Sequence, residues 1–153
     1  MIEDLAGFRL SRLSDVLAAT DSRLRQGDTG SLRPWATGFD PLDGFLAGGL
    51  RPGELTILGG PQGLGKTTFA LQVARHVISL GHPVLYVSYE HDGVNILERL
   101  IAAEAGERAG RDAVPLRAVR ALIEGDGSAA SLSDKLAETP GGAEALSTIT
   151  ADL

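Results

Sequence analysis

Eight consecutive residues near the middle of the chain have the types and the spacing needed to hold phosphate groups. They read Gly60-Pro61-Gln62-Gly63-Leu64-Gly65-Lys66-Thr67. A glycine-rich turn lets successive backbone N–H groups converge on one phosphate, and a helix that follows adds its positive N-terminal end. The ammonium of Lys66 can reach the outer phosphates, and the hydroxyl of Thr67 can coordinate Mg²⁺. With Thr68 beside it, the run predicts a P-loop that binds a nucleoside triphosphate and Mg²⁺.

Such a loop must be held by an element on each side. Before it, residues 54–58 form a compact apolar run bounded by glycines, which is typical of a buried strand. After it, apolar residues recur at helical spacing from Thr67 to Leu80, and Gly81 and Pro83 end that pattern. A plain structural glycine loop is the alternative, which this flanking pattern disfavours.

A carboxylate follows the next apolar run. Residues 84–88 predict a second buried strand, and residues 94–105 predict a second helix. The order strand, helix, strand, helix predicts an α/β fold with a parallel sheet and right-handed crossovers. Ligands of such sheets lie at the carboxyl ends of the strands, so Glu90 could face the terminal phosphate and orient a water. The alternative is an exposed acid that opens a loop, as is more usual for its neighbours His91 and Asp92.

Composition excludes several other classes of protein. The chain has 153 residues, a net charge of −6 and no cysteine, which excludes disulfides and thiolate metal sites. The negative charge argues against a protein that binds nucleic acid over its whole surface. No run approaches the roughly 18 apolar residues of a membrane span, and the acidic start is unlike a secretory signal. No metal-ligand spacing connects the three histidines. The simplest interpretation is a cytoplasmic globular protein with no membrane contact.

The ends of the chain are less clearly patterned than its middle. We interpret residues 1–33 as a helical arm and linker that packs on a neighbouring subunit, and residues 34–153 as the core. An ordinary first helix of the same domain is the alternative for the arm. Helices are also predicted over residues 115–124 and, through a Ser-x-x-Asp capping pattern, over residues 131–138. A break is expected at residues 125–128, and residues 143–153 are ambiguous.

These motifs resemble the entry and P-loop of RecA-like ATPases, and in particular the C-terminal ATPase domain of DnaB-type replicative helicases. The resemblance covers about residues 35–105 and depends on short segments on either side of the loop. The matching segments are Thr37-Gly38-Phe39, Leu42-Asp43, Gly48-Gly49-Leu50, Pro52-Gly53-Glu54-Leu55, Gly65-Lys66-Thr67-Thr68-Phe69-Ala70-Leu71, Ser88-Tyr89-Glu90 and Leu97-Glu98-Arg99-Leu100.

The resemblance implies a RecA-like α/β/α sandwich and a hexameric ring, a homo-oligomer that couples ATP hydrolysis to movement on single-stranded DNA. ATP and Mg²⁺ would be the cofactors, and Glu90, with Lys66, would serve catalysis. Such proteins also carry a Walker B strand ending in Asp, and an arginine finger from a neighbouring subunit. Asp152 is a weak candidate for the Walker B position and so for a metal contact. The arginines after Glu90 show no evident aim at a neighbouring site.

Three functions therefore remain open from the sequence. The first is a helicase-type ATPase, and the second is a recombination or regulatory ATPase of the RadA or KaiC kind. The third is a non-catalytic nucleotide-binding module. Because no strong Walker B candidate is found, we expect the chain to be the first part of an ATPase core, truncated before that strand. Such a chain would bind ATP, hydrolyse it poorly and unwind no DNA.

Overall fold

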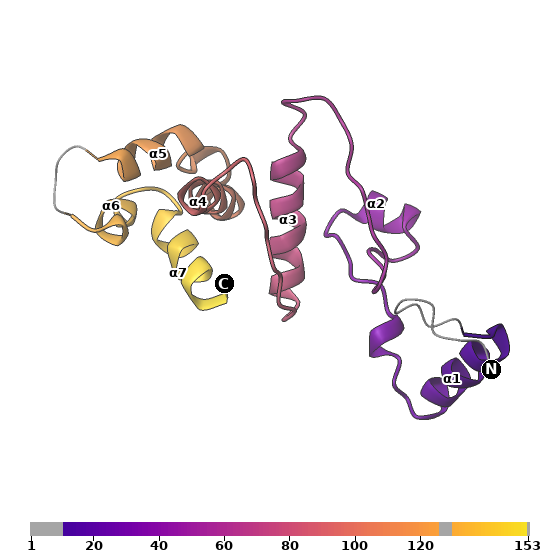
Figure 1. The fold of residues 1–153 in the computed structure, drawn as a ribbon. Helices are drawn as coiled ribbons and strands as arrows, with labels where there is room; N and C mark the ends of the chain where they lie inside the picture. Colours follow the sequence, from indigo (N-terminus) through magenta and orange to yellow (C-terminus); the bar gives the residue numbers. More distant parts are fainter. Residues whose placement is uncertain (1–10, 126–129, 153) are drawn as a thin grey trace.

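The computed structural model describes residues 11–125 and 130–152, and its regular elements are helices (Figure 1). The arm residues 1–10 and the predicted break at residues 126–128 lie outside this part. The α-helices are α1 (Leu13–Arg25), α2 (Asp40–Phe45), α3 (Lys66–Ser79), α4 (Gly93–Ala109), α5 (Leu116–Glu124), α6 (Leu132–Ala137) and α7 (Gly142–Asp152). Two 3₁₀ turns, η1 (Gly30–Leu32) and η2 (Gly110–Asp112), lie between them.

The hydrophobic core lies among the four C-terminal helices, which Figure 1 shows gathered at one end of the molecule. Apolar side chains from α4 to α7 and from the turn before α5 meet there and exclude water. They are Ile101, Ala105, Val114, Val119, Leu136, Ala145 and Ile149. Full burial of each large aliphatic side chain contributes about 1.5–3 kcal/mol, so this cluster is the main source of stability in the described residues.

Local signals explain where these helices begin. The Ser131 hydroxyl accepts a hydrogen bond from the Asp134 N–H at 3.1 Å, and the Asp134 carboxylate accepts one from the Ser131 N–H at 3.2 Å. This capping box confirms the helix predicted from the Ser-x-x-Asp pattern. Gly141 precedes α7 with φ +73°, and a Cβ there would lie 3.0 Å from the Ala105 carbonyl oxygen. Glycine therefore lets α7 start close against α4.

Helix α3 stands beside α4 and meets the N-terminal segment on its other side (Figure 1). The rings of Phe39 and Phe69 stack with centroids 4.9 Å apart, which fixes the start of α2 against the start of α3. The ring of Trp35 stacks on His82, just beyond the end of α3, also at 4.9 Å. These two contacts hold the segment before α2 against both ends of the helix that follows the P-loop.

Helix α1 lies within residues 1–33, and none of its residues is buried. Its apolar stripe, which includes Leu13, Leu17 and Leu24, faces solvent. The division of the chain into an arm and a core, and the packing of the arm on a neighbouring subunit, stay predictions. Light scattering on a chain that lacks residues 1–30 would test them, since an unchanged mass per particle would contradict the arm.

The predicted RecA-like α/β fold with its parallel sheet is wrong for the described residues. Across residues 11–125 and 130–152 no strand forms, and the β-pairing is one isolated bridge between Trp35 and Leu50. In the two apolar runs at residues 54–58 and 84–88, Leu55 and Leu85 are 87% and 89% exposed. A strand needs a neighbour for its backbone N–H and C=O groups, and a short apolar run carries no information about that neighbour. The core forms among helices without either run.

None of the helices in the part of the chain that the structure describes combines the length and the apolar character needed to cross a membrane.

Candidate nucleotide site

A cavity of about 640 Å³ lies between the P-loop and the start of α4. One wall comes from the loop and the first turn of α3, and its residues are Gln62, Gly63, Gly65, Lys66, Thr67 and Thr68. The other wall comes from the connection into α4 and from α4 itself, with Glu90, His91 and Arg99. The structure thus brings the predicted catalytic carboxylate, the lysine and the hydroxyl residues to one cavity. A cavity of this size is typical of small-molecule sites.

The conformation of the loop depends on its glycines. Gly63 and Gly65 have φ values of +84° and +86°, in the left-handed region that other residues rarely adopt. Gly65 is also the N-cap residue of α3, so the helix begins at Lys66 and directs its positive end toward the loop. A substitution that adds a Cβ at either glycine would strain this turn.

The ammonium of Lys66 reaches back over the loop. Its Nζ donates hydrogen bonds to the carbonyl oxygens of Gly60 and Pro61, each at 2.9 Å. An ammonium has three N–H donors, so one remains for an anion in the cavity. Gly60 and Pro61 therefore act through their carbonyl groups, while the side chain of Leu64 is exposed.

The wall that carries Glu90 is fixed by the beginning of α4. The Ser88 hydroxyl accepts a hydrogen bond from the His91 N–H at 3.0 Å, and the Asp92 carboxylate caps α4 by accepting from the Asn95 N–H at 2.9 Å. These bonds to Asn95 lower the pKa of Asp92, so the cap is ionised at neutral pH. Asp92 is thus a structural residue, as its position in a loop suggested, and Glu90 lies two residues before the cap.

Arg99 is the residue that sequence reasoning missed. It lies in α4, and the sequence pattern directed none of the arginines after Glu90 to a particular site. Side chains of an α-helix lean toward its N-terminus, so a long side chain at this position can return to the cavity beside Glu90. The available signal was its place in the second turn of the helix that follows Glu90.

Two predicted metal features have different outcomes. Thr67 lines the cavity, and so a Mg²⁺ ion bound with a triphosphate would find a hydroxyl there. Asp152 is the last residue of α7, so the segment before it is helical and not a strand. No group of three or more metal-ligating acids and histidines forms in the described residues. A bound Mg²⁺ ion would accordingly take its other ligands from phosphate oxygens and water, as Mg²⁺ in nucleotide sites usually does.

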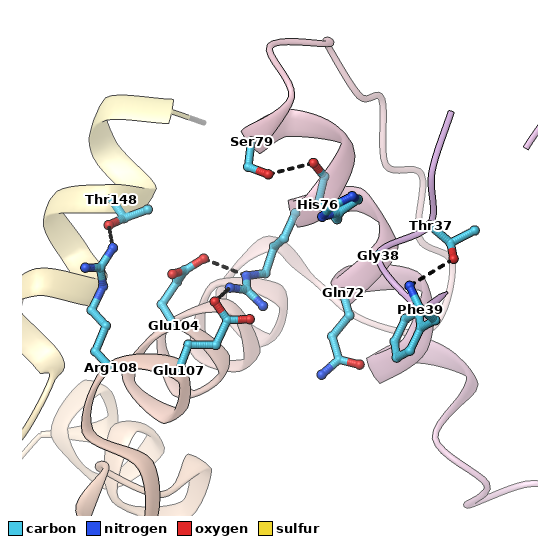
Figure 2. A pocket seen from close by; sticks show the side chains of 11 residues that line it. Thr37, Gly38, Phe39, Gln72, His76, Ser79, Glu104, Glu107, Arg108 and Thr148 are labelled. Carbon is cyan, nitrogen blue, oxygen red and sulfur yellow. Dashed lines mark hydrogen bonds and ion pairs between the residues drawn. The ribbon is translucent and has the colours of Figure 1, made fainter. Parts of the chain in front are cut away.

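A second hollow, of about 430 Å³, lies between α3, α4 and the segment before α2 (Figure 2). Arg75 of α3 pairs there with Glu104 at 2.6 Å and with Glu107 at 2.9 Å, both from α4. Figure 2 also shows the guanidinium of Arg108 directed at the Thr148 hydroxyl of α7. Because these groups satisfy one another, we interpret this hollow as a joint that holds α3 on α4, and so holds the P-loop opposite Glu90.

One edge of this hollow is formed by Thr37 and Gly38, which donate hydrogen bonds to the Asp43 carboxylate, and we call these three residues the clasp. Asp43 Oδ1 accepts from the Thr37 N–H at 2.8 Å and from the Thr37 hydroxyl at 2.7 Å, and Oδ2 accepts from the Gly38 N–H at 3.3 Å. Gly38 has φ +85°, and a Cβ there would lie 2.7 Å from the His76 ring. The clasp therefore needs a glycine both for its backbone angle and for its contact with α3.

The clasp predicts a titration at low pH. Burial alone would raise the pKa of Asp43, but the hydrogen bonds from Thr37 and Gly38 and the nearby His76 lower it below 3.8. A carboxyl with a lowered folded-state pKa stabilises the clasp above its unfolded value, and this contribution is lost as the pH falls through the folded value. The amide signals of Thr37 and Gly38 in ¹⁵N NMR spectra should thus shift with a midpoint below 3.8. A midpoint above 3.8, or the same transition in Asp43→Asn, would contradict the clasp.

The chain is similar to known proteins, and a family model matches the part that contains the cavity. A family model described as the DnaB-like helicase C terminal domain matches residues 35–113. The DNA repair protein RadA of Mycobacterium tuberculosis is 44% identical over 69 residues, which cover 45% of this chain and 14% of that protein. The replicative DNA helicase DnaB of Treponema pallidum is 33% identical over 109 residues, covering 69% of this chain and 24% of that protein. No solved structure matches the chain.

The chain belongs to the DnaB-like helicase C-terminal domain family, since the family model matches more than half of its 153 residues. This confirms the resemblance to the C-terminal domain of DnaB-type helicases. The matched part spans 14% of the RadA and 24% of the DnaB relative. All residues that line the cavity fall within the range that the family model matches.

Proposed function

We propose that the chain binds ATP with Mg²⁺ in the cavity between the P-loop and α4. The observation that carries this proposal is the convergence of Lys66, Thr67 and Glu90 on one cavity. The loop with its left-handed glycines and the N-terminus of α3 would hold the phosphates, with the free N–H of Lys66 on the outer ones. Thr67 would contact the Mg²⁺ ion, which supplies charge neutralisation when it is bound.

Hydrolysis is the second part of the proposal and depends on Glu90. Its carboxylate would orient a water against the terminal phosphate, and Lys66 would balance charge on the transferring group. In a protein of this family, such turnover would be coupled to movement on single-stranded DNA in a hexameric ring. Binding of single-stranded DNA and assembly of a ring are separate from binding of ATP, so each of the three is measured alone.

The test of the proposal measures binding and hydrolysis on the same preparation. A fluorescent ATP analogue should bind the wild-type chain with Mg²⁺ present. Glu90→Gln should keep that affinity and lower single-turnover phosphate release about a hundredfold or more, since general base catalysis contributes about 10²–10⁴. Single-turnover conditions detect a slow rate as well as a fast one.

Glu138→Gln supplies the matched control, because Glu138 is an exposed acid just after α6 and does not line the cavity. Equal rates in Glu90→Gln and wild type would remove Glu90 from the mechanism. Wild-type release no faster than in buffer would leave a nucleotide-binding module without hydrolysis. An absence of binding by the wild type would overturn the proposal as a whole.

A second candidate is an ATPase of the RadA kind. The observation that favours it is the 44% identity to the RadA protein of Mycobacterium tuberculosis, against 33% for the DnaB protein of Treponema pallidum. Both candidates use the same nucleotide site, so ATP binding does not separate them. Phosphate release measured with single-stranded DNA and with branched DNA would separate them. Full stimulation by the single strand favours the helicase motor, and stronger stimulation by branched DNA favours the second candidate.

A further inference from the structure

Arg99 has a buried guanidinium nitrogen that lacks a partner. Its Nε is inaccessible to solvent and makes no hydrogen bond within the part of the chain that the structure describes. An arginine does not lose its proton in a protein, so this nitrogen belongs to a charged group. A buried N–H donor without a partner is unfavourable, and its presence on a cationic side chain points to an anion that arrives from outside the chain.

The other charged side chains of α4 show that this is a property of Arg99 and not of the helix. Glu98, one residue earlier, pairs with Arg120 of α5 at 3.1 Å. Glu104 and Glu107 pair with Arg75 of α3 at 2.6 and 2.9 Å, and Arg108 donates to the Thr148 hydroxyl of α7. These four groups bind other helices, whereas Arg99 lines the cavity beside Glu90 and His91. Its partner is therefore expected inside the cavity.

We propose that Arg99 binds the terminal phosphate of the nucleotide and so makes the site prefer ATP to ADP. This inference rests on the proposed function of the same cavity. The P-loop wall carries Lys66, and the opposite wall carries Glu90 and Arg99. A group that shares the wall of Glu90 lies where the attacking water and the outermost phosphate would be. The planar fork of a guanidinium matches two phosphate oxygens, which a lysine does not.

An ion pair with Glu90 is the competing role for Arg99. The described residues show no ion pair between the two side chains, although both line the cavity. An ion pair with Glu90 would neutralise the carboxylate to the same extent whether the site holds ATP or ADP. The two roles thus differ in whether ADP binding is affected.

The experiment compares binding of fluorescent analogues of ATP and ADP, each with Mg²⁺, to the full chain and to three variants. Arg99→Gln should weaken ATP binding about tenfold or more while ADP binding changes by less than about twofold. The substitution removes a charge-assisted bond to the third phosphate, which ADP lacks. Arg99→Lys should recover part of the ATP affinity. Arg117→Gln is the control, since Arg117 is an exposed arginine of α5 that does not line the cavity.

The outcomes distinguish the two proposals. A wild type that binds neither analogue overturns the nucleotide site and this inference together. A wild type that binds both, with an unchanged ATP to ADP ratio in Arg99→Gln, overturns the role of Arg99 alone. If circular dichroism shows that Arg99→Gln is unfolded, binding of tripolyphosphate and of pyrophosphate to the wild type and to Arg99→Lys decides instead. A loss of affinity in Arg99→Lys that is confined to tripolyphosphate supports the inference, and an equal loss for both anions, or no loss, contradicts it.

Discussion

Replacing Lys66 by Ala is expected to weaken binding of a fluorescent ATP analogue by about a hundredfold or more. The substitution removes the one cation on the P-loop wall of the cavity. Bonds from a charged donor contribute about 1.5–3 kcal/mol each, and each 1.4 kcal/mol is a tenfold change in affinity. Because the Lys66 ammonium also bonds to the Gly60 and Pro61 carbonyl groups, the loop would lose an internal brace as well.

Equilibrium binding with Mg²⁺ measures this effect, and the chain offers a close control. Lys135 is the only other lysine in the sequence, and its ammonium also donates to a backbone carbonyl, that of Leu122 at 3.3 Å. It does not line the cavity. Lys135→Ala should therefore leave nucleotide affinity unchanged, even if it alters stability. Equal affinity of wild type and Lys66→Ala would show that phosphate binds elsewhere or not at all.

Glu104→Gln is expected to lower the stability of the chain by removing one partner of a buried ion pair. Glu104 and Arg75 are each about 10% exposed and lie 2.6 Å apart. Burial would lower the pKa of Arg75, but its bonds to Glu107 and Glu104 outweigh this effect and raise the pKa. The guanidinium therefore stays charged, and removal of the buried carboxylate leaves it with a neutral neighbour. We expect the free energy of unfolding to fall by about 2 kcal/mol.

The matched variant is Glu107→Gln, which removes the other carboxylate on the same arginine. The Glu107 side chain is 66% exposed, and its pair with Arg75 at 2.9 Å is in contact with solvent. Exposed pairs contribute less than about 1 kcal/mol, so this change should have a small effect. Urea denaturation followed by circular dichroism gives both values. Equal losses in the two variants would show that burial does not set the strength of this joint.

The helices of this protein could be predicted because their signals are local. The apolar spacing at residues 67–80 and 94–105 and the Ser131 capping pattern each depend on residues within a few positions of one another. The structure places α3, α4 and α6 at those positions. The ambiguous segment at residues 143–153 became α7 because Ala145 and Ile149, one helical turn apart, are both buried in the core.

The α/β prediction was wrong because pairing between strands is not a local property. Residues 54–58 and 84–88 have the composition of buried strands, yet the helical core leaves them exposed. Apolar composition reports a tendency to be buried, while a sheet also needs neighbouring backbone in register. That information lies in the positions of distant residues and was absent from each run.

The sequence by itself determined the P-loop and the helix after it, since glycine, lysine and hydroxyl spacing fix the chemistry within eight residues. It also indicated Glu90 as a candidate catalytic residue, but only from its place after an apolar run. The tertiary structure decided that Glu90 and Lys66 line one cavity, because the joint of Arg75 with Glu104 holds α3 beside α4. It also decided that Arg99 lines that cavity, with an Nε that has no hydrogen-bond partner among the described residues. Those relations join residues 24 to 33 positions apart in the chain, a separation at which only the packing of helices sets which side chains meet.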